Sequence, residues 1–161
     1  MKLLPLGLIG VGCLTGMFGF ASIAQAADAA VEAPIQQFVT AFNKGDGAGA
    51  AATMTARVSI IDEVAPFQWR GPDAFARWGA ALEADSKARD IADQSVAIGA
   101  PTREIVSGVS AYVIVPATYS FRQKGVKMAE VAQMTFTLMK GDAGWKIAGW
   151  TWTGPEASVA K

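Results

Sequence analysis

Asp62 is the side chain whose position in the sequence best suits it to chemistry. It follows Val58 and Ile60 at alternate positions of a β-branched segment, so these three side chains should share one face of a strand. A carboxyl group among apolar neighbours has a raised pKa and can act as a general base. Glu63 should face the other way, so a paired-carboxylate site would need a different partner. The alternative is a structural role, in which Asp62 is solvated or paired with an arginine, and the candidates are Arg70, Arg103 and Arg122.

Composition limits the chemistry to carboxylates, lysine, tyrosine and hydroxyl groups. The chain has no histidine, and its single cysteine, Cys13, lies in an apolar N-terminal segment. This excludes Ser-His-Asp and Cys-His nucleophilic sites, imidazole metal ligands and, after that segment, thiolate zinc sites. Removing Lys2 from the 14 basic residues leaves 13 against 14 acidic ones, so no net field attracts nucleic acid or anionic lipid. We therefore expect no metal, no nucleic-acid partner and no cofactor.

Residues 1–26 have the pattern of a bacterial secretory signal peptide. Lys2 is followed by an uncharged apolar run, and Ala24-Gln25-Ala26 matches a small-x-small cleavage site, so we expect cleavage after Ala26 and export to the periplasm or beyond. The alternatives are a retained membrane anchor and, with less support, a lipid anchor on Cys13, which is followed by apolar residues instead of a polar mature chain. Residues 27–154 have the length of one domain, and 155–161 are expected to be a disordered tail.

The helical signals come first along the chain. Apolar residues at helical spacing predict a helix over 32–43, ended by Gly45, and Asp46 should cap a short second helix over 47–54. A strand is predicted over 57–63 and a short one over 67–69. Gly71-Pro72-Asp73 should then open a third helix that carries Trp78.

Long alternating runs follow, and they predict a four-strand meander over about 92–104, 110–122, 126–139 and 145–153. Tight turn sequences separate the last three runs, and Gly99-Ala100-Pro101 suits a bend or bulge within the first. Helices followed by a meander indicate an α+β domain in which a curved antiparallel sheet wraps around N-terminal helices. Such an arrangement leaves a cavity between the two layers.

Four segments together resemble the nuclear transport factor 2-like (NTF2-like) superfamily, which includes ketosteroid isomerases and SnoaL-like polyketide cyclases. They are Pro34 to Asp46, the strand ending in Asp62, Trp69-Arg70-Gly71-Pro72 before a helix, and the closing strand from Gly144 to Trp150. The resemblance covers nearly all of the mature chain and implies a cone-shaped fold. It does not specify a function, because this superfamily includes enzymes, binding modules and dimerisation domains.

The resemblance to ketosteroid isomerases places the general base at Asp62, but the oxyanion donors are missing. The tyrosine donor of helix one corresponds to Phe38, and the second, acidic donor falls near Gln133 or Met134, where only an amide could serve. Loss of one such donor costs ~10²- to 10³-fold in rate, so steroid isomerisation is disfavoured.

Aromatic residues could line the cavity or simply fill the core. Pockets for small molecules are mostly apolar with a few polar groups, although aromatic residues at helical spacing are commonly core. The side chains expected to contact a ligand are Phe38, Phe42, Ile60, Phe67, Trp69, Trp78, Tyr119, Gln133 and Phe136.

The tryptophans of the closing strand suggest a contact with a second subunit. Trp150 and Trp152 should share one face, opposite Trp145, so at least one set would lie on the outer surface of the sheet. The outer face often meets a second subunit in this superfamily, and we expect a homodimer. The alternative is that the stems of Lys146 or Arg122 cover the rings.

Three functions follow from these patterns. The first is an exported domain that binds a small apolar molecule in the cone. The second is a cofactor-free isomerase, dehydratase or cyclase with Asp62 as the base and Trp69 or Tyr119 as positioning groups. The third is a dimerisation module with a filled cone.

Overall fold

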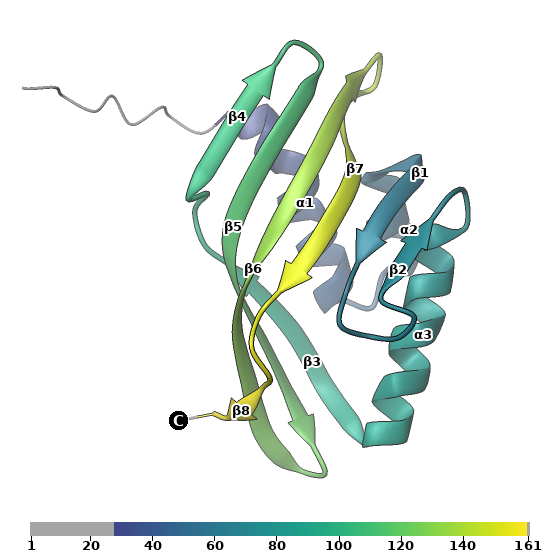
Figure 1. Ribbon diagram of the computed structural model, residues 1–161, viewed down its shortest axis with the longest axis vertical. Helices are drawn as coiled ribbons and strands as arrows, with labels where there is room; N and C mark the ends of the chain where they lie inside the picture. The colour runs from purple at the N-terminus through teal and green to yellow at the C-terminus, as the bar shows by residue number, and fades with distance from the viewer. Residues whose placement is uncertain (1–27, 161) are drawn as a thin grey trace, which may run out of the picture.

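A curved sheet packs against three helices in the computed structural model, which describes residues 28–160 (Figure 1). The helices are α1 (Ala29–Asn43), α2 (Gly47–Ala52) and α3 (Ala74–Arg89). The strands are β1 (Met54–Ile61), β2 (Gln68–Arg70), β3 (Ile91–Ile98), β4 (Arg103–Ser107), β5 (Ser110–Gln123), β6 (Val126–Gly141), β7 (Gly144–Thr153) and β8 (Ser158–Val159). The predicted α+β class and the order of the elements are confirmed.

Helix α1 begins earlier than predicted because Asp28 caps it. The Asp28 side chain accepts a hydrogen bond from the Ala30 N–H, and the longer helix includes Pro34. Val31, Ile35 and other residues of one face are buried against the sheet. As predicted, a positive φ of 67° at Gly45 follows the end of the helix.

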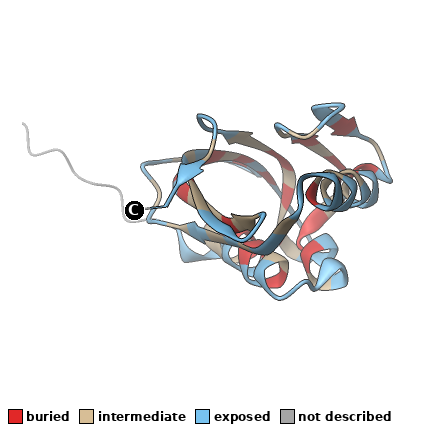
Figure 2. Cartoon of the chain, turned by 90° about the horizontal axis from the view of Figure 1, so that it is seen from below, coloured by how far each residue is buried: buried red, intermediate tan, exposed pale blue. Residues whose placement is uncertain are grey.

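The sheet has the strand order β2-β1-β7-β6-β5-β3, and β4 pairs with the other half of β5. The single strand predicted over 92–104 is therefore two strands, which separate at the expected bend near Gly99. Strands β5, β6 and β7 form an antiparallel meander, whereas β1 lies parallel to β7. Buried residues gather between the concave side of the sheet and the helices (Figure 2).

A β-bulge in β7 overturns the expected arrangement of its tryptophans. Leu138 pairs with Ile147 and Thr137 with Gly149, so Ala148 is an extra residue and the alternation restarts after it. Trp145 and Trp150 are consequently both buried in the core, at 8% and 3% exposure, and Trp152 packs against it. The prediction that one set of tryptophans lies on the outer face was wrong.

The segment 155–161 was expected to be a disordered tail, but a short strand lies within its described part, 155–160. Ser158–Val159 forms strand β8, which pairs with Ala129 and Met128 at the start of β6. Main-chain hydrogen bonds to β6 hold this short segment in place, and its composition alone did not predict this pairing. The predicted signal peptide lies outside the described residues. Within residues 28–160, no helix combines the length and apolar character needed to cross a membrane.

Candidate functional site

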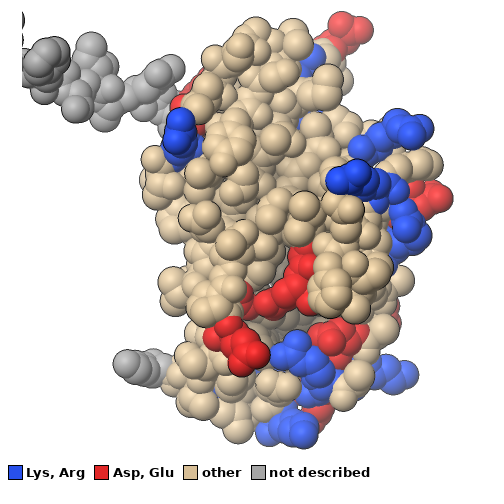
Figure 3. Space-filling model, in the orientation of Figure 1, with Lys and Arg blue, Asp and Glu red and all other residues tan. Residues whose placement is uncertain are grey.

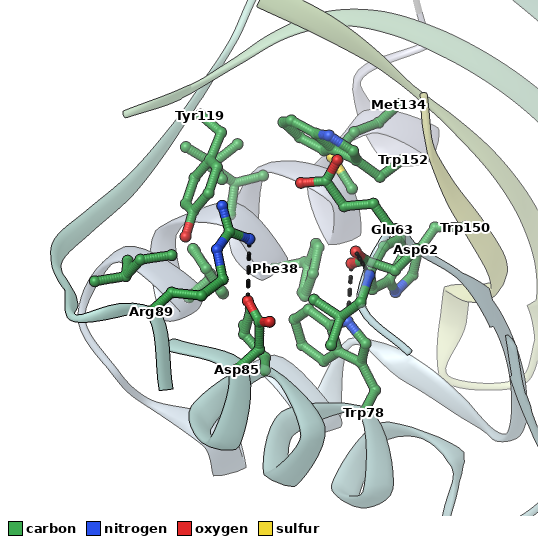
Figure 4. A pocket seen from close by; sticks show the side chains of 16 residues that line it. Phe38, Asp62, Glu63, Trp78, Asp85, Arg89, Tyr119, Met134, Trp150 and Trp152 are labelled. Atoms are coloured by element: carbon green, nitrogen blue, oxygen red, sulfur yellow. Dashed lines mark hydrogen bonds and ion pairs between the residues drawn. The ribbon is translucent and has the colours of Figure 1, made fainter. Parts of the chain in front are cut away.

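A narrow pocket lies between the concave side of the sheet and helices α1 and α3 (Figure 4). Its cavity volume is about 60 Å³. At ~15 Å³ for each water-sized site, that space holds about four water molecules. Sixteen residues line this inner pocket: Phe38, Val39, Phe42, Asp62, Glu63, Val64, Trp78, Leu82, Asp85, Arg89, Ile91, Val96, Tyr119, Met134, Trp150 and Trp152.

Packed aromatic rings form the floor of the inner pocket. The ring of Trp78 meets that of Trp150 edge-on, with centroids 5.0 Å apart, and Phe38 lies 5.8 Å from Trp150. The indole N–H of Trp150 is buried and has no hydrogen-bond partner among the described residues. A buried donor of this kind is costly to leave unsatisfied, so an acceptor on a bound molecule would stabilise it.

Asp62 is held in the pocket by two donors. The Trp78 indole N–H donates to its Oδ2 at 2.9 Å, and the Val64 N–H donates to Oδ1 at 3.3 Å. Burial raises the pKa of the Asp62 carboxyl above its ordinary value, although these hydrogen bonds oppose the shift. The three arginines considered as partners make no ion pair with Asp62. The carboxyl group therefore has the surroundings of a general base.

Glu63 enters the same pocket, contrary to the expectation that it faces away. Strand β1 ends at Ile61, so the strict alternation of side chains stops before Asp62 and Glu63. Desolvation and the neighbouring Glu130 carboxylate raise the pKa of Glu63 to about 7. Glu130 is itself only 2% exposed and accepts a hydrogen bond of 2.7 Å from the Trp152 indole N–H. The two glutamates form a carboxyl pair at the pocket's edge.

On the opposite side of the pocket lie an ion pair between Arg89 and Asp85 and the hydroxyl group of Tyr119. Arg89 Nη1 lies 3.2 Å from Asp85 Oδ2 one turn earlier on α3. The Tyr119 hydroxyl donates to the Gln94 side-chain oxygen. Burial raises the pKa of Tyr119, so its hydroxyl stays protonated at neutral pH.

A larger outer cavity of about 670 Å³ adjoins the inner pocket and shares five lining residues with it. These are Glu63, Val64, Asp85, Arg89 and Tyr119, and the other walls come from Ala65, Phe67, Phe121, Gln123, Glu156 and Ala157. Acidic side chains gather around a hollow in the lower half of the molecule in Figure 3, with basic side chains at its lower edge. The inner pocket is thus the narrow end of a wider space.

The predicted site residues fall into three groups. Asp62, Phe38, Phe42, Trp78 and Tyr119 line the inner pocket, as expected.

The second group packs below the pocket or beside it. Ile60, Trp69 and Phe136 are at most 2% exposed and belong to the core, where Phe136 contacts the ring of Phe38. Phe67 is 59% exposed and lines the outer cavity.

The expectation for Gln133 was wrong. It is exposed on the outer face of β6, because Met134, Phe136 and Leu138 occupy the inner face at alternate positions. Met134, the neighbour also considered for this position, lines the pocket instead.

Sequence patterns did not single out Glu63, Asp85, Arg89 or Glu130 as site residues. Asp85 and Arg89 are spaced one helical turn apart, which predicts only an ordinary surface pair. Glu130 lies on the inner face of β6, as the alternation of this strand requires. A charged residue at a position predicted to be buried is unusual, and this could have identified Glu130 from the sequence. No group of three or more acidic residues within 28–160 is arranged to hold a metal ion.

Comparisons with known proteins agree with the observed fold. The sequence profile of the SnoaL-like domain matches residues 31–151. No curated protein sequence matches the chain. Among solved structures, a ketosteroid isomerase-like protein from Erwinia carotovora atroseptica is 23% identical, with a TM-score of 0.62 over 80% of this chain and 95% of that one.

Two further structures are similar in fold at 14% identity. An NTF2-like superfamily protein from Salmonella enterica has a TM-score of 0.64 over 78% of this chain and 89% of that one. A hexachlorocyclohexane dehydrochlorinase has a TM-score of 0.63 over 81% and 88%, respectively. These likenesses show that the fold is shared with NTF2-like proteins. The sequence match over most of the chain shows that it belongs to the SnoaL-like domain family.

Proposed function

We propose that this protein is an exported domain that binds a small, mainly apolar molecule at the junction of its inner pocket and outer cavity. The observation that carries the proposal is the aromatic floor formed by Phe38, Trp78 and Trp150, which opens through a few polar groups into a wider space. Binding sites for small molecules have this composition of apolar walls with a few placed polar groups.

The size of the two spaces indicates how a ligand would sit. The inner pocket, at about 60 Å³, is well below the ~150 Å³ of an apolar cavity that holds benzene in another protein. It accepts a group of a few heavy atoms, and the remainder of the molecule would occupy the outer cavity. Phe67, exposed on the outer rim, offers an apolar contact there.

Native mass spectrometry of the protein purified from the periplasm of an expression host tests this proposal. A measured mass equal to that of residues 27–161 would support export and cleavage after Ala26. A co-purified small molecule that is released on denaturation would support ligand binding. Bare protein, together with no change in tryptophan fluorescence across a library of apolar compounds, would contradict it.

A second candidate function is catalysis without a cofactor, with Asp62 as the base. Two carboxyl groups with raised pKa values lie side by side in one pocket, and such perturbed pairs are frequent at catalytic sites. The Trp150 indole N–H offers a donor near the same space, whereas the Tyr119 hydroxyl already donates to Gln94. If turnover of any substrate is found, Asp62→Asn should abolish it with little change in melting temperature. A variant that keeps its turnover would remove Asp62 from the mechanism.

We also propose a homodimer, formed through the outer face of the sheet. Exposed apolar side chains on this face include Tyr112 and Val131, and the upper part of the face in Figure 3 carries few charges. Sedimentation should show a dimer that Tyr112→Lys converts to a monomer. A wild-type protein that sediments as a monomer at micromolar concentration would exclude this interface.

A further inference from the structure

The balance of charge around the two cavities differs from that of the whole chain. The chain has equal numbers of acidic and basic residues, 14 of each. Four of the residues lining the two cavities are acidic, namely Asp62, Glu63, Asp85 and Glu156, and one, Arg89, is basic. Arg89 forms its ion pair with Asp85 and acts on Glu63 only as a weaker, more distant charge. Within residues 28–160, Asp62, Glu63 and Glu156 make no ion pair with a basic side chain.

The carboxyl pair of Glu63 and Glu130 increases the excess of acidic over basic groups around the cavities. Glu130 adds a buried carboxyl directly behind Glu63, and the hydrogen bond that it receives from Trp152 comes from a neutral donor. Two carboxyl groups in such surroundings repel one another unless a proton or another cation lies close by. Asp62 likewise receives only neutral donors, from Trp78 and a backbone N–H.

The walls around these carboxyl groups suit an organic cation. The rings of Trp78, Trp150, Trp152 and Tyr119 line the same pocket as Asp62 and Glu63 (Figure 4). Aromatic faces attract ammonium groups through their quadrupole, most strongly where water is excluded. An independent sign that the pocket is built for a ligand is the Trp150 N–H, which is buried at 3% exposure of the residue and has no partner within residues 28–160. It can donate to an acceptor atom of the ligand other than the protonated nitrogen.

We infer that the ligand of this pocket is a small amine, which places its protonated nitrogen beside Glu63 and Asp62 and its apolar part against the aromatic floor. This inference rests on the proposed binding function and deepens it by naming the charge of the ligand. The nitrogen sits where the two cavities meet, because Glu63 lines both of them. Anionic molecules of the same shape are repelled there.

A matched set of three compounds tests the inference with the protein purified from the periplasm. Butylamine, butan-1-ol and butanoate share one short alkyl body, sized for the inner pocket, and are cationic, neutral and anionic at pH 7.5. Affinity is measured by quenching of tryptophan fluorescence and confirmed by calorimetry. We expect the amine to bind about tenfold more tightly than the alcohol and the carboxylate to bind more weakly than either.

Two variants test whether the preference for the amine over the alcohol arises in the pocket. Glu63→Gln should reduce the ratio of the amine affinity to the alcohol affinity about fivefold or more, because it removes the negative charge beside the nitrogen. Glu83→Gln, which makes the same change at an exposed position of α3 outside both cavities, should behave as the wild type. Asp62→Asn provides a second test of the same effect if Glu63→Gln does not fold.

The possible results separate the inference from the function on which it rests. If the alcohol binds as tightly as the amine, the protein binds apolar molecules but the inferred positive charge is wrong. Equal loss of amine binding in Glu63→Gln and Glu83→Gln would also overturn it, because the effect would then be one of overall charge. If none of the three compounds binds, both the inference and the proposed binding function fail for ligands of this size.

Discussion

The stability of this protein should decrease between pH 5 and pH 8 because of Glu63. In the folded state its pKa is raised from 4.5 to about 7, first by desolvation and then by Glu130, while Asp62 adds to the shift and Arg89 opposes it. The folded state therefore holds more protons than the unfolded chain between pH 4.5 and 7. Stability present at low pH is lost as the pH rises through this window.

The size of the effect follows from the shift. A change from 4.5 to about 7 corresponds to roughly 3 kcal/mol for a fully buried group. Glu63 is exposed at the mouth of the pocket, so solvent screening reduces this to about 1 kcal/mol. The absence of histidine is an advantage here, because no side chain with an ordinary pKa near 6.5 titrates in the same range.

Urea unfolding followed by tryptophan fluorescence at pH 5, 6, 7 and 8 measures this effect. The free energy of unfolding of the wild type should fall by about 1 kcal/mol relative to that of Glu63→Gln across the range. Glu83→Gln is the matched control and should follow the wild type. Parallel curves for the wild type and Glu63→Gln would refute the reasoning, since they would mean that Glu63 titrates alike in the folded and unfolded states.

Three further predictions concern the residues around the carboxyl pair. Glu130→Gln should move the pKa of Glu63 down toward 4.5, as measured by NMR titration of the side-chain carboxyl carbons; an unchanged value would show that desolvation alone sets it. Trp152→Phe removes a 2.7 Å hydrogen bond to the buried Glu130 and should lower the free energy of unfolding by about 2 kcal/mol. The loss should be smaller in a Glu130→Gln background, and equal losses in the two backgrounds would show that Trp152 and Glu130 are not coupled. Gly154→Ala should lower the free energy of unfolding in urea by about 1–3 kcal/mol, because the new Cβ would lie 2.7 Å from that of Ala132. Gly141→Ala, which has open space around it, is the control and should have no such effect; equal effects would contradict the close packing around Gly154.

The fold was largely predictable because its signals are local. Apolar spacing predicted α1, alternation predicted β5, β6 and β7, and Gly99 marked the point at which β3 and β4 separate. What the sequence did not reveal was pairing between distant segments. The short strand β8 depends on the free edge of β6, and the parallel contact of β1 with β7 has no local signature.

The site was only half predictable, because the prediction depended on strict alternation. Asp62 lies in the pocket, where alternation had placed it, but β1 ends at Ile61, so Glu63 does not take the opposite face that alternation predicted. A shift of one residue reverses every side chain that follows it, and the bulge at Ala148 brings Trp150 and Trp152 to the concave side in the same way. The tertiary pairing that ends a strand or inserts a bulge cannot be read from composition or periodicity.

The parallel contact between β1 and β7 has a consequence for how the protein is made. Ile60, two residues before Asp62, pairs with Trp150 in the last long strand. During synthesis the pocket cannot assemble until nearly the entire polypeptide has emerged. Contacts between distant segments slow folding, so the closure of the pocket should be among the last events in the folding of the chain.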